Sequence, residues 1–209
     1  MRALISTYDK TGLDVFARGL AELGWRLVAS GGTATYLEEL GLEVEHVDAL
    51  TDSPEMLGGR VKTLHPRIHA AILARRDHAD DVATLAEFDI EPFDLVCVNL
   101  YPFEEAIAKQ GVTEAEAVEK IDVGGPSMLR GAAKNFAHVI AVCRADRYGF
   151  VIDELRAHGE LSLETRRELA AEAFATTAAY DAAIAAWFTA LEPFPETLVL
   201  PLEKILDLS

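Results

Sequence analysis

The sequence is poor in cysteine, in long apolar runs and in positive charge. Only Cys97 and Cys143 occur among the 209 residues, and both lie in apolar segments, so we expect buried free thiols. No run approaches the ~18 consecutive apolar residues of a membrane span. Residues 1–6 are too short to hold the apolar region of a signal peptide. These absences predict a cytoplasmic protein that does not enter membranes.

Positive charge is scarce, because 19 Lys and Arg stand against 35 Asp and Glu, for a net charge of −16. Nucleic acids and anionic membranes would be repelled, so neither is an expected partner. A hydrophobic content of 50% with 26% charged residues is typical of globular chains rather than disordered ones. We expect one domain over residues 1–191, followed by a proline-containing extended tail or linker over residues 192–209.

The acidic residues leave three long gaps, at residues 23–37, 56–76 and 123–145. All three gaps hold glycine-rich or basic motifs. Buried apolar strands also lack acids, and this accounts for part of the first gap but not for five Lys and Arg in the second. Keeping negative charge away from one region is how an acidic protein can still attract an anion. The pattern therefore predicts a site for a small anionic ligand.

The hydrophobic pattern alternates between strand-like runs and helical spacing, which predicts an α/β fold with a parallel sheet. A loop with a functional role is expected at residues 48–65, and the apolar run at 68–73 fits either type of element. Strands are expected at residues 2–7, 25–29, 43–47, 93–100 and 139–142. Helices are expected at residues 11–23, 30–40, 78–88, 103–110, 113–120 and 162–191.

Residues 30–33 (SGGT) lie between a predicted strand and a predicted helix. Glycine at a helix start frees backbone N–H groups to cradle a phosphate, and the Ser and Thr hydroxyls can assist. An ordinary capped turn between strand and helix explains the same residues. The segment is neither a P-loop nor a dinucleotide fingerprint.

Two further glycine pairs adjoin charged side chains. If residues 58–65 are extended, Arg60 and Lys62 point to the same side, where they could clamp an oxyanion and polarise a carbonyl. A solvated basic loop is the alternative. Asp122 precedes the second glycine pair and could accept a substrate amide N–H or hold a base, unless it only caps the following helix, which carries Lys134.

The strongest predicted strand ends at residues 99–102 (NLYP). Open α/β sheets bind ligands at the carboxyl ends of their strands, so Tyr101 could donate a hydrogen bond to a ligand there. His65 and His69 are four residues apart but have no carboxylate cluster beside them, so no metal site is expected. No nucleophile elbow or Cys/His pairing suggests covalent catalysis.

Six motifs occur in order along the chain: residues 8–12 (YDKTG), 27–33 (LVASGGT), 54–66 (PEMLGGRVKTLHP), 99–103 (NLYPF), 121–125 (IDVGG) and 132–135 (AAKN). Together they resemble the inosine monophosphate (IMP) cyclohydrolase domain of the bifunctional purine-biosynthesis protein, over essentially all of residues 1–200. The resemblance implies a methylglyoxal-synthase-like three-layer fold, with a central, mainly parallel sheet flanked by helices. It also implies a homodimer.

The implied reaction closes the ring of 5-formamidoimidazole-4-carboxamide ribotide (FAICAR) to give IMP and water, without a metal or organic cofactor. The family's bifunctional protein continues into a formyltransferase domain, whereas this sequence stops near where that domain should begin. We therefore expect an isolated domain or a monofunctional protein, with the formyltransferase as a separate domain or partner. Folate-dependent formyl transfer is not expected of these residues.

The resemblance carries site residues over position by position. Catalytic roles fall on Lys62, Tyr101, Asp122 and Lys134. Substrate contacts fall on Ser6, Tyr8, Lys10, Ser30, Gly31, Gly32, Thr33, Arg60, Val61, Lys62, Thr63, Val98, Asn99, Asp122, Val123, Gly124 and Gly125. Residues 30–33 and Lys10 would hold the 5′-phosphate. Tyr8 departs from the family, because many members have a small Ser there, so its contact with phosphate could differ.

The implied chemistry divides the catalytic work among four side chains. Asp122 would orient the carboxamide, Lys62 and Tyr101 would polarise the formyl oxygen, and Lys134 would move a proton. Which lysine is acid and which is base stays open. Two other functions of the same fold compete: a methylglyoxal synthase, which would use a carboxylate base in the first motifs, and a nucleotide-sensing module, which would need only the phosphate loop.

Overall fold

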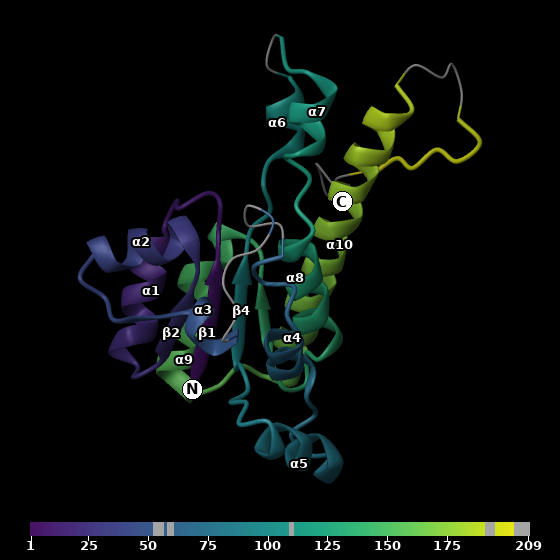
Figure 1. Cartoon of the computed structure of the whole chain (residues 1–209). Helices are drawn as coiled ribbons and strands as arrows, with labels where there is room; N and C mark the ends of the chain where they lie inside the picture. The colour runs from purple at the N-terminus through teal and green to yellow at the C-terminus, as the bar shows by residue number, and fades with distance from the viewer. Residues whose placement is uncertain (52–56, 58–60, 109–110, 191–194, 203–209) are drawn as a thin grey trace, which may run out of the picture. The chain divides into compact units, whose positions relative to one another are not determined.

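A computed structural model describes residues 1–51, 57, 61–108, 111–190 and 195–202, and a parallel sheet lies at its centre (Figure 1). The strand order is β3-β2-β1-β4-β5, and every neighbouring pair is parallel. The strands are β1 (Arg2–Ser6), β2 (Arg26–Ala29), β3 (Val44–His46), β4 (Leu95–Val98) and β5 (Ile140–Val142). The predicted parallel α/β sheet is confirmed.

Helices connect these strands, as expected for parallel pairs, which need crossover connections. The helices between strands are α1 (Leu13–Glu22), α2 (Gly31–Glu39), α3 (Val47–Thr51), α4 (Pro66–Leu73), α5 (Ala79–Glu87), α6 (Phe103–Ile107), α7 (Glu114–Val118) and α8 (Gly124–Lys134). The 3₁₀ helix η2 (Ala145–Arg147), α9 (Tyr148–His158) and α10 (Leu163–Phe188) follow β5. Ser162 caps the start of α10, because its Oγ accepts a hydrogen bond from the Thr165 N–H at 3.1 Å.

Two apolar cores lie on the two faces of the sheet, because alternate strand residues point to opposite sides. Ala3 and Ile5 of β1 pack with side chains from α1, α2 and α9. Leu4, between them, packs on the other face with side chains from α3, α4, α8 and α10. Both expected free thiols are confirmed as buried, and burial raises the pKa of Cys97 to about 12, so this thiol stays protonated at neutral pH.

The chain divides into two compact units, and each is described by itself. The first unit, residues 1–101 and 122–174, contains the whole sheet. The second unit comprises residues 102–121 and 175–209. In it, Thr113 and Glu116 form a reciprocal capping box at the start of α7, and the rings of Phe103 and Trp187 meet edge to face with centroids 5.6 Å apart. The predicted domain boundary at residue 191 stays a prediction.

Two segments differ from the sequence prediction, and a third resolves an alternative that the sequence left open. The expected loop at 48–65 begins within α3, where Val47 and Thr51 are buried four residues apart on one side of a short helix. The ambiguous run at 68–73 belongs to α4, because Pro66 starts a helix with Ile68, Ala71 and Ile72 buried. Helix α9 was not predicted at all, although its four buried side chains, at residues 148, 151, 152 and 155, follow helical spacing.

Within the described residues, no helix is both long enough and apolar enough to cross a bilayer.

Candidate active site

The strand order places a topological switch between β1 and β4. From β1 the chain proceeds outward through β2 to β3, whereas β4 and β5 lie on the other side of β1. The connections that follow β1 and β4 therefore diverge, and in such sheets the crevice at the carboxyl ends binds ligands. Three of the sequence motifs, at residues 8–12, 30–33 and 99–101, directly follow β1, β2 and β4. The topology brings these three motifs to one edge of the sheet.

Asn99 ties the loops after β1 and β4 together. Its Oδ1 accepts hydrogen bonds from the backbone N–H groups of Tyr8 at 2.6 Å and Asp9 at 3.2 Å, and its Nδ2 donates to the Asp9 carbonyl at 2.8 Å. Its side-chain amide is thus engaged on both ends. The sequence predicts a substrate contact for Asn99 but not these hydrogen bonds, because Tyr8 and Asp9 lie about 90 residues away along the chain.

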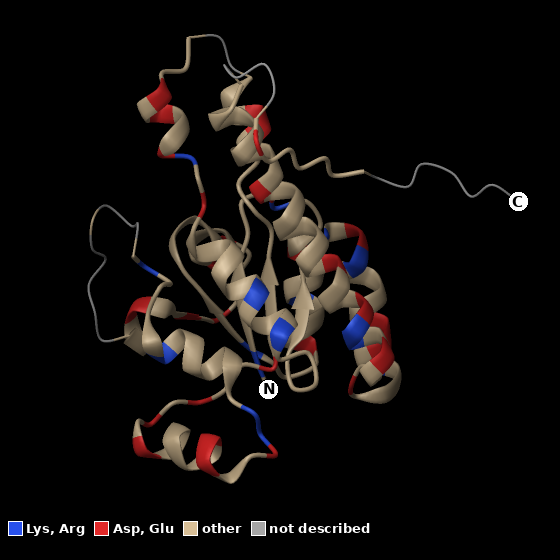
Figure 2. Ribbon diagram, turned by 90° about the vertical axis from the view of Figure 1, so that its right-hand side faces the viewer, with Lys and Arg blue, Asp and Glu red and all other residues tan. Residues whose placement is uncertain are grey.

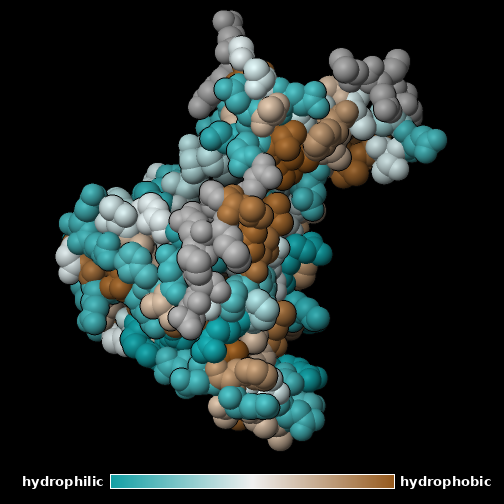
Figure 3. Space-filling view, viewed as in Figure 1, coloured by the Kyte–Doolittle hydropathy of each residue, from teal (hydrophilic) through white to brown (hydrophobic). Residues whose placement is uncertain are grey.

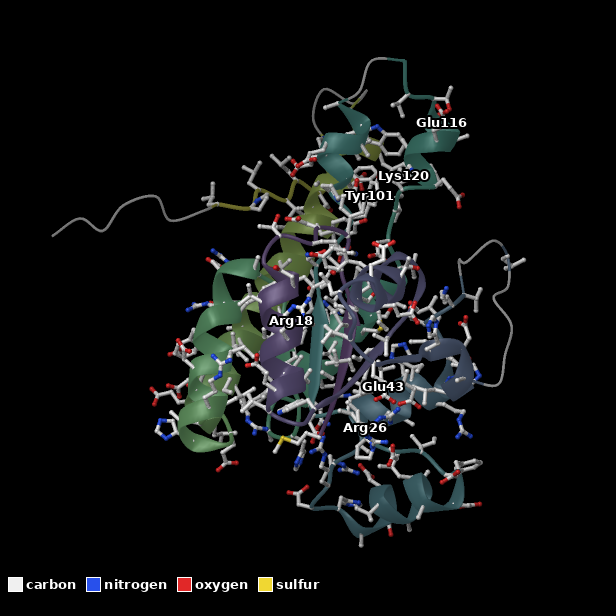
Figure 4. The ribbon with its side chains drawn as sticks, turned by 90° about the vertical axis from the view of Figure 1, so that its left-hand side faces the viewer. Arg18, Arg26, Glu43, Tyr101, Glu116 and Lys120 are labelled. Atoms are coloured by element: carbon white, nitrogen blue, oxygen red, sulfur yellow. The ribbon has the colours of Figure 1, made fainter. Side chains whose placement is uncertain are left out.

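The clamp carries an aromatic pair above the ends of the strands. The rings of Tyr8 and Tyr101 meet edge to face with centroids 4.4 Å apart and planes inclined by 61°. Figure 4 shows Tyr101 beyond the carboxyl edge of the sheet. Tyr8 is 52% exposed, so its aromatic ring occupies space that a small Ser at this position would leave open.

Lys10 and Thr33 join the end of β1 to the start of α2. The Thr33 hydroxyl accepts a hydrogen bond from the Thr7 N–H at 3.1 Å and donates to the Thr7 carbonyl at 3.0 Å. The Lys10 ammonium donates to the same hydroxyl at 3.1 Å and to the Thr7 carbonyl. Burial lowers the pKa of Lys10, with Asp9 opposing that shift. The Thr33 hydroxyl therefore braces the loop, which leaves the Gly31–Gly32 backbone and the Lys10 charge to attract an anion.

Replacing Thr33 tests this brace. We expect Thr33→Val to lower the free energy of unfolding by about 1–3 kcal/mol, because the buried Thr7 N–H loses its acceptor and the Thr7 carbonyl keeps only its hydrogen bond from Lys10. Urea denaturation would measure the loss. The matched control is Thr35→Val on the same helix, whose exposed hydroxyl makes only a 3.4 Å contact and should matter by less than about 0.5 kcal/mol. Equal effects of the two changes would contradict the assignment.

Lys62 reaches the first turn of α2. A Cβ added at Gly31 would lie 3.6 Å from the Lys62 Nζ, so the ammonium sits against the helix N-terminus. Gly31 also has a φ of +52°, in the left-handed region where side chains are disfavoured. Lys62 itself is half-buried. Lys10, Lys62 and the N-terminus of α2 thus create a local region of positive electrostatic potential in an acidic protein.

Asp122 caps α8, as the alternative interpretation of this residue held. Its Oδ1 accepts a hydrogen bond from the Gly125 N–H at 2.9 Å. Burial raises the pKa of Asp122, while hydrogen bonds from the N–H groups of Gly125 and Gly124 pull that pKa down. A Cβ at Gly125 would overlap the Asp122 carboxylate, and a Cβ at Gly124 would overlap the Thr63 hydroxyl. Glycine is therefore required at both positions for this packing. Thr63, the residue next to Lys62, packs against the start of α8.

The remaining expected site residues fall into four groups. Ser6 and Val98 are the last residues of β1 and β4, and Val61 and Val123 flank the Lys62 and Asp122 positions. Arg60 lies outside the described residues, as do Gly58 and Gly59. Lys134 is the last residue of α8, about 15 Å along the helix from Gly124 at 1.5 Å per residue. The structure therefore does not bring Lys134 to Asp122 within one copy of the chain.

Comparisons with known proteins identify the family of the chain. The family model of the MGS-like domain matches residues 12–127, more than half of the chain. The chain belongs to the MGS-like domain family. A second family model, the AICARFT/IMPCHase bienzyme, matches residues 132–209 of this MGS-like protein.

Relatives of this MGS-like chain include two bacterial proteins, each described as bifunctional purine biosynthesis protein PurH. The protein of Leuconostoc mesenteroides is 56% identical over 207 residues, covering 99% of this chain and 40% of that protein. The protein of Listeria welshimeri is 54% identical over 197 residues, covering 93% and 39%. The chain thus spans about two fifths of their length. The crystal structure of ForH is similar in fold, with a TM-score of 0.81, 42% identity, and coverage of 90% of this chain and 98% of ForH.

Proposed function

We propose that the chain is an IMP cyclohydrolase, which closes the second ring of a purine nucleotide by converting FAICAR to IMP and water. The observation that carries the proposal is the convergence of Lys62 with the N-termini of α2 and α8 at the carboxyl edge of the sheet. The identity to PurH over nearly the whole chain supports the same substrate.

The 5′-phosphate would bind at the start of α2. Backbone N–H groups of the first turn point outward from a helix N-terminus, and its dipole favours an anion there. Lys10 lies beside this turn and adds a positive charge. Within the described structure the Ser30 side chain caps no N–H of α2, which leaves its hydroxyl available to a phosphate oxygen.

Ring closure requires the weakly nucleophilic carboxamide nitrogen to attack the formyl carbon. A C–N bond forms, the formyl oxygen leaves as water, and each of the two reacting nitrogens gives up one hydrogen. Asp122 would accept a hydrogen bond from the carboxamide and aim its nitrogen, while Lys62 and Tyr101 would stabilise negative charge on the formyl oxygen. Because the two groups belong to one molecule, the protein does not need to bring them together; its contribution is to hold them in the orientation in which the nitrogen can attack.

Other parts of the proposal follow from the substrate. FAICAR is a formylated amine, so a formyltransferase, as a further domain or a separate partner, must supply it. We also propose that the chain works as a homodimer.

The two competing functions would require different properties of the same site. A methylglyoxal synthase would need a carboxylate base near residues 8–12, but the Asp9 carboxylate accepts hydrogen bonds from the Thr11 N–H at 2.9 Å and the Thr11 hydroxyl at 2.7 Å. These hydrogen bonds lower the pKa of Asp9, which makes it a weaker base. A sensor module would bind the nucleotide without converting it.

Turnover of FAICAR by single variants tests the role assignment. We expect Lys62→Ala and Lys134→Ala each to lower the rate of IMP formation, followed by ultraviolet absorbance, by about 10²-fold or more. Lys120→Ala, in the second unit, is the control and should keep the wild-type rate. Near-normal turnover in both test variants would refute the assignment. Tight binding of IMP without turnover of FAICAR by the wild-type chain would favour the sensor.

A further inference from the structure

The Tyr8 ring lies in the candidate active site, but the proposed chemistry uses other side chains. The ring is 52% exposed, and it meets the ring of Tyr101 edge to face with centroids 4.4 Å apart. Figure 3 shows hydrophobic side chains gathered over α8, whereas the surface over α2, which is hydrogen-bonded to the loop that follows β1, is mainly hydrophilic. A ring left half exposed beside such a surface adds little to the core, so its contact with Tyr101 is the more informative feature.

The segment that carries Tyr101 has no regular structure to hold the side chain. Strand β4 ends at Val98 and α6 begins at Phe103, and residues 99–102 between them are neither helix nor strand. A tyrosine side chain moves between staggered rotamers, and a change of χ1 carries its hydroxyl through several ångströms. The position of the Tyr101 hydroxyl therefore depends on what contacts its ring.

The same segment holds Tyr8 through its backbone and through its side chain. Strands β1 and β4 pair as far as Ser6 and Val98, so the two loops leave the sheet side by side. The Asn99 Oδ1 accepts a hydrogen bond from the Tyr8 N–H at 2.6 Å, which fixes the backbone from which the Tyr8 ring projects. The ring then contacts Tyr101, two residues after Asn99. The fixed backbone of one loop is thus linked, through one ring, to the side chain of the other.

We propose that Tyr8 is a positioning residue, whose ring holds the Tyr101 ring in the orientation that directs the Tyr101 hydroxyl at the formyl oxygen of the substrate. The proposal rests on the proposed function, in which Tyr101 stabilises negative charge on that oxygen. In an edge-to-face pair the positive edge of one ring meets the negative face of the other, so the contact favours an inclined arrangement, here 61°. A donor that is already oriented stabilises developing charge better than one that must first turn toward it.

Steady-state kinetics of Tyr8 variants with FAICAR test this role. We expect Tyr8→Ala to lower kcat about 3–10-fold while KM changes by less than about twofold, because the lost contact orients a group that acts in the transition state. Tyr8→Phe keeps the ring and should restore most of the rate. The matched control is Phe88→Ala, which removes a ring of similar exposure, 54%, and should keep the wild-type rate. Phe88 follows α5, the helix with acidic residues at the bottom of Figure 2.

A double variant shows whether Tyr8 acts through Tyr101. Tyr101→Phe removes the hydroxyl and keeps the ring, so adding Tyr8→Ala to it should cost no further rate, because no hydroxyl is left to orient. Additive losses would overturn the proposal, as would a rise in KM at unchanged kcat, since both would mean that Tyr8 contacts the substrate itself. Equal losses in Tyr8→Ala and Tyr8→Phe would also overturn it, because they would assign the effect to the Tyr8 hydroxyl.

Nuclear magnetic resonance of the substrate-free chain separates this role from the proposed function. With ring-labelled tyrosine, Tyr8→Ala should shift the ring signals of Tyr101 and leave those of Tyr148, which stacks on Phe16, in place. Unmoved Tyr101 signals would overturn the proposal even if FAICAR is converted. Shifted signals in a chain that never converts FAICAR would refute the proposed function, and with it the target of the hydroxyl, while the contact between the rings would stand.

Discussion

Asp122→Asn is expected to lower kcat for FAICAR cyclisation by about 10²–10⁴-fold, the range of an acid–base or charge-orienting group. The amide oxygen of Asn can still accept the hydrogen bond from the Gly125 N–H, so the start of α8 should survive. What the variant loses is the negative charge that aligns the carboxamide. Steady-state kinetics should therefore show a fall in kcat, with unchanged far-ultraviolet circular dichroism.

The pH dependence of the wild type sharpens this prediction. Burial raises the pKa of Asp122, so its carboxylate is lost at a higher pH than that of an ordinary Asp as the solution is acidified. The acid limb of the kcat/KM profile should accordingly lie at a higher pH than the pKa of an ordinary Asp, and Asp122→Asn should abolish it. A variant with near-normal kcat and an unchanged acid limb would contradict the role of Asp122.

The same shift predicts the effect on stability. Where a carboxyl has a higher pKa in the folded state than in the unfolded state, the free energy of unfolding of the protein falls as the pH rises from the unfolded pKa through the folded pKa. Asp122 therefore disfavours folding at neutral pH relative to acid, through the burial of its charge. We expect Asp122→Asn to be at least as stable as the wild type at pH 7, which separates lost chemistry from lost folding.

Gly124→Ala is the second change with a large expected effect. The new Cβ would overlap the Thr63 hydroxyl, so the Thr63 side chain must rotate or move, and we expect the adjacent Lys62 to be displaced. A displacement of about 1 Å in a catalytic group can lower kcat about 10²-fold. The matched control is Gly149→Ala in α9, where a Cβ meets nothing within 4 Å and the rate should not change.

A double variant distinguishes this clash from general damage to α8. Thr63→Ala removes the overlapping hydroxyl, and the Thr63 Cβ lies 3.8 Å from the new methyl position, an ordinary contact. The Gly124→Ala/Thr63→Ala chain should therefore be faster than Gly124→Ala alone, a positive coupling in the double-mutant cycle. Strictly additive losses would show that residues 63 and 124 do not meet.

Local pattern predicts most of the sheet and little of how the site is braced. Strands such as β4 are short buried apolar runs, and this signal lies within a few residues of sequence. The clamp of Asn99 on Tyr8 and Asp9 depends on strands that meet about 90 residues apart, so no local pattern reports it. The ambiguity at 68–73 had a local solution, since Pro66 marks the start of α4.

Lys134 shows a different limit of sequence analysis. Its motif follows closely after the Asp122 motif, which suggests that the two residues act together in one site. A helix converts that interval of sequence into ~15 Å of separation, and only the structure reveals the distance. Proximity along the chain therefore does not establish proximity in the site.

The central claim is tested most directly by mixing the purified wild-type chain with FAICAR and recording the ultraviolet absorbance of IMP against an enzyme-free blank. We predict conversion to IMP well above the blank, without added metal or folate, and its near loss in Asp122→Asn. A wild-type rate equal to the blank, from folded protein that binds IMP, would contradict the claim.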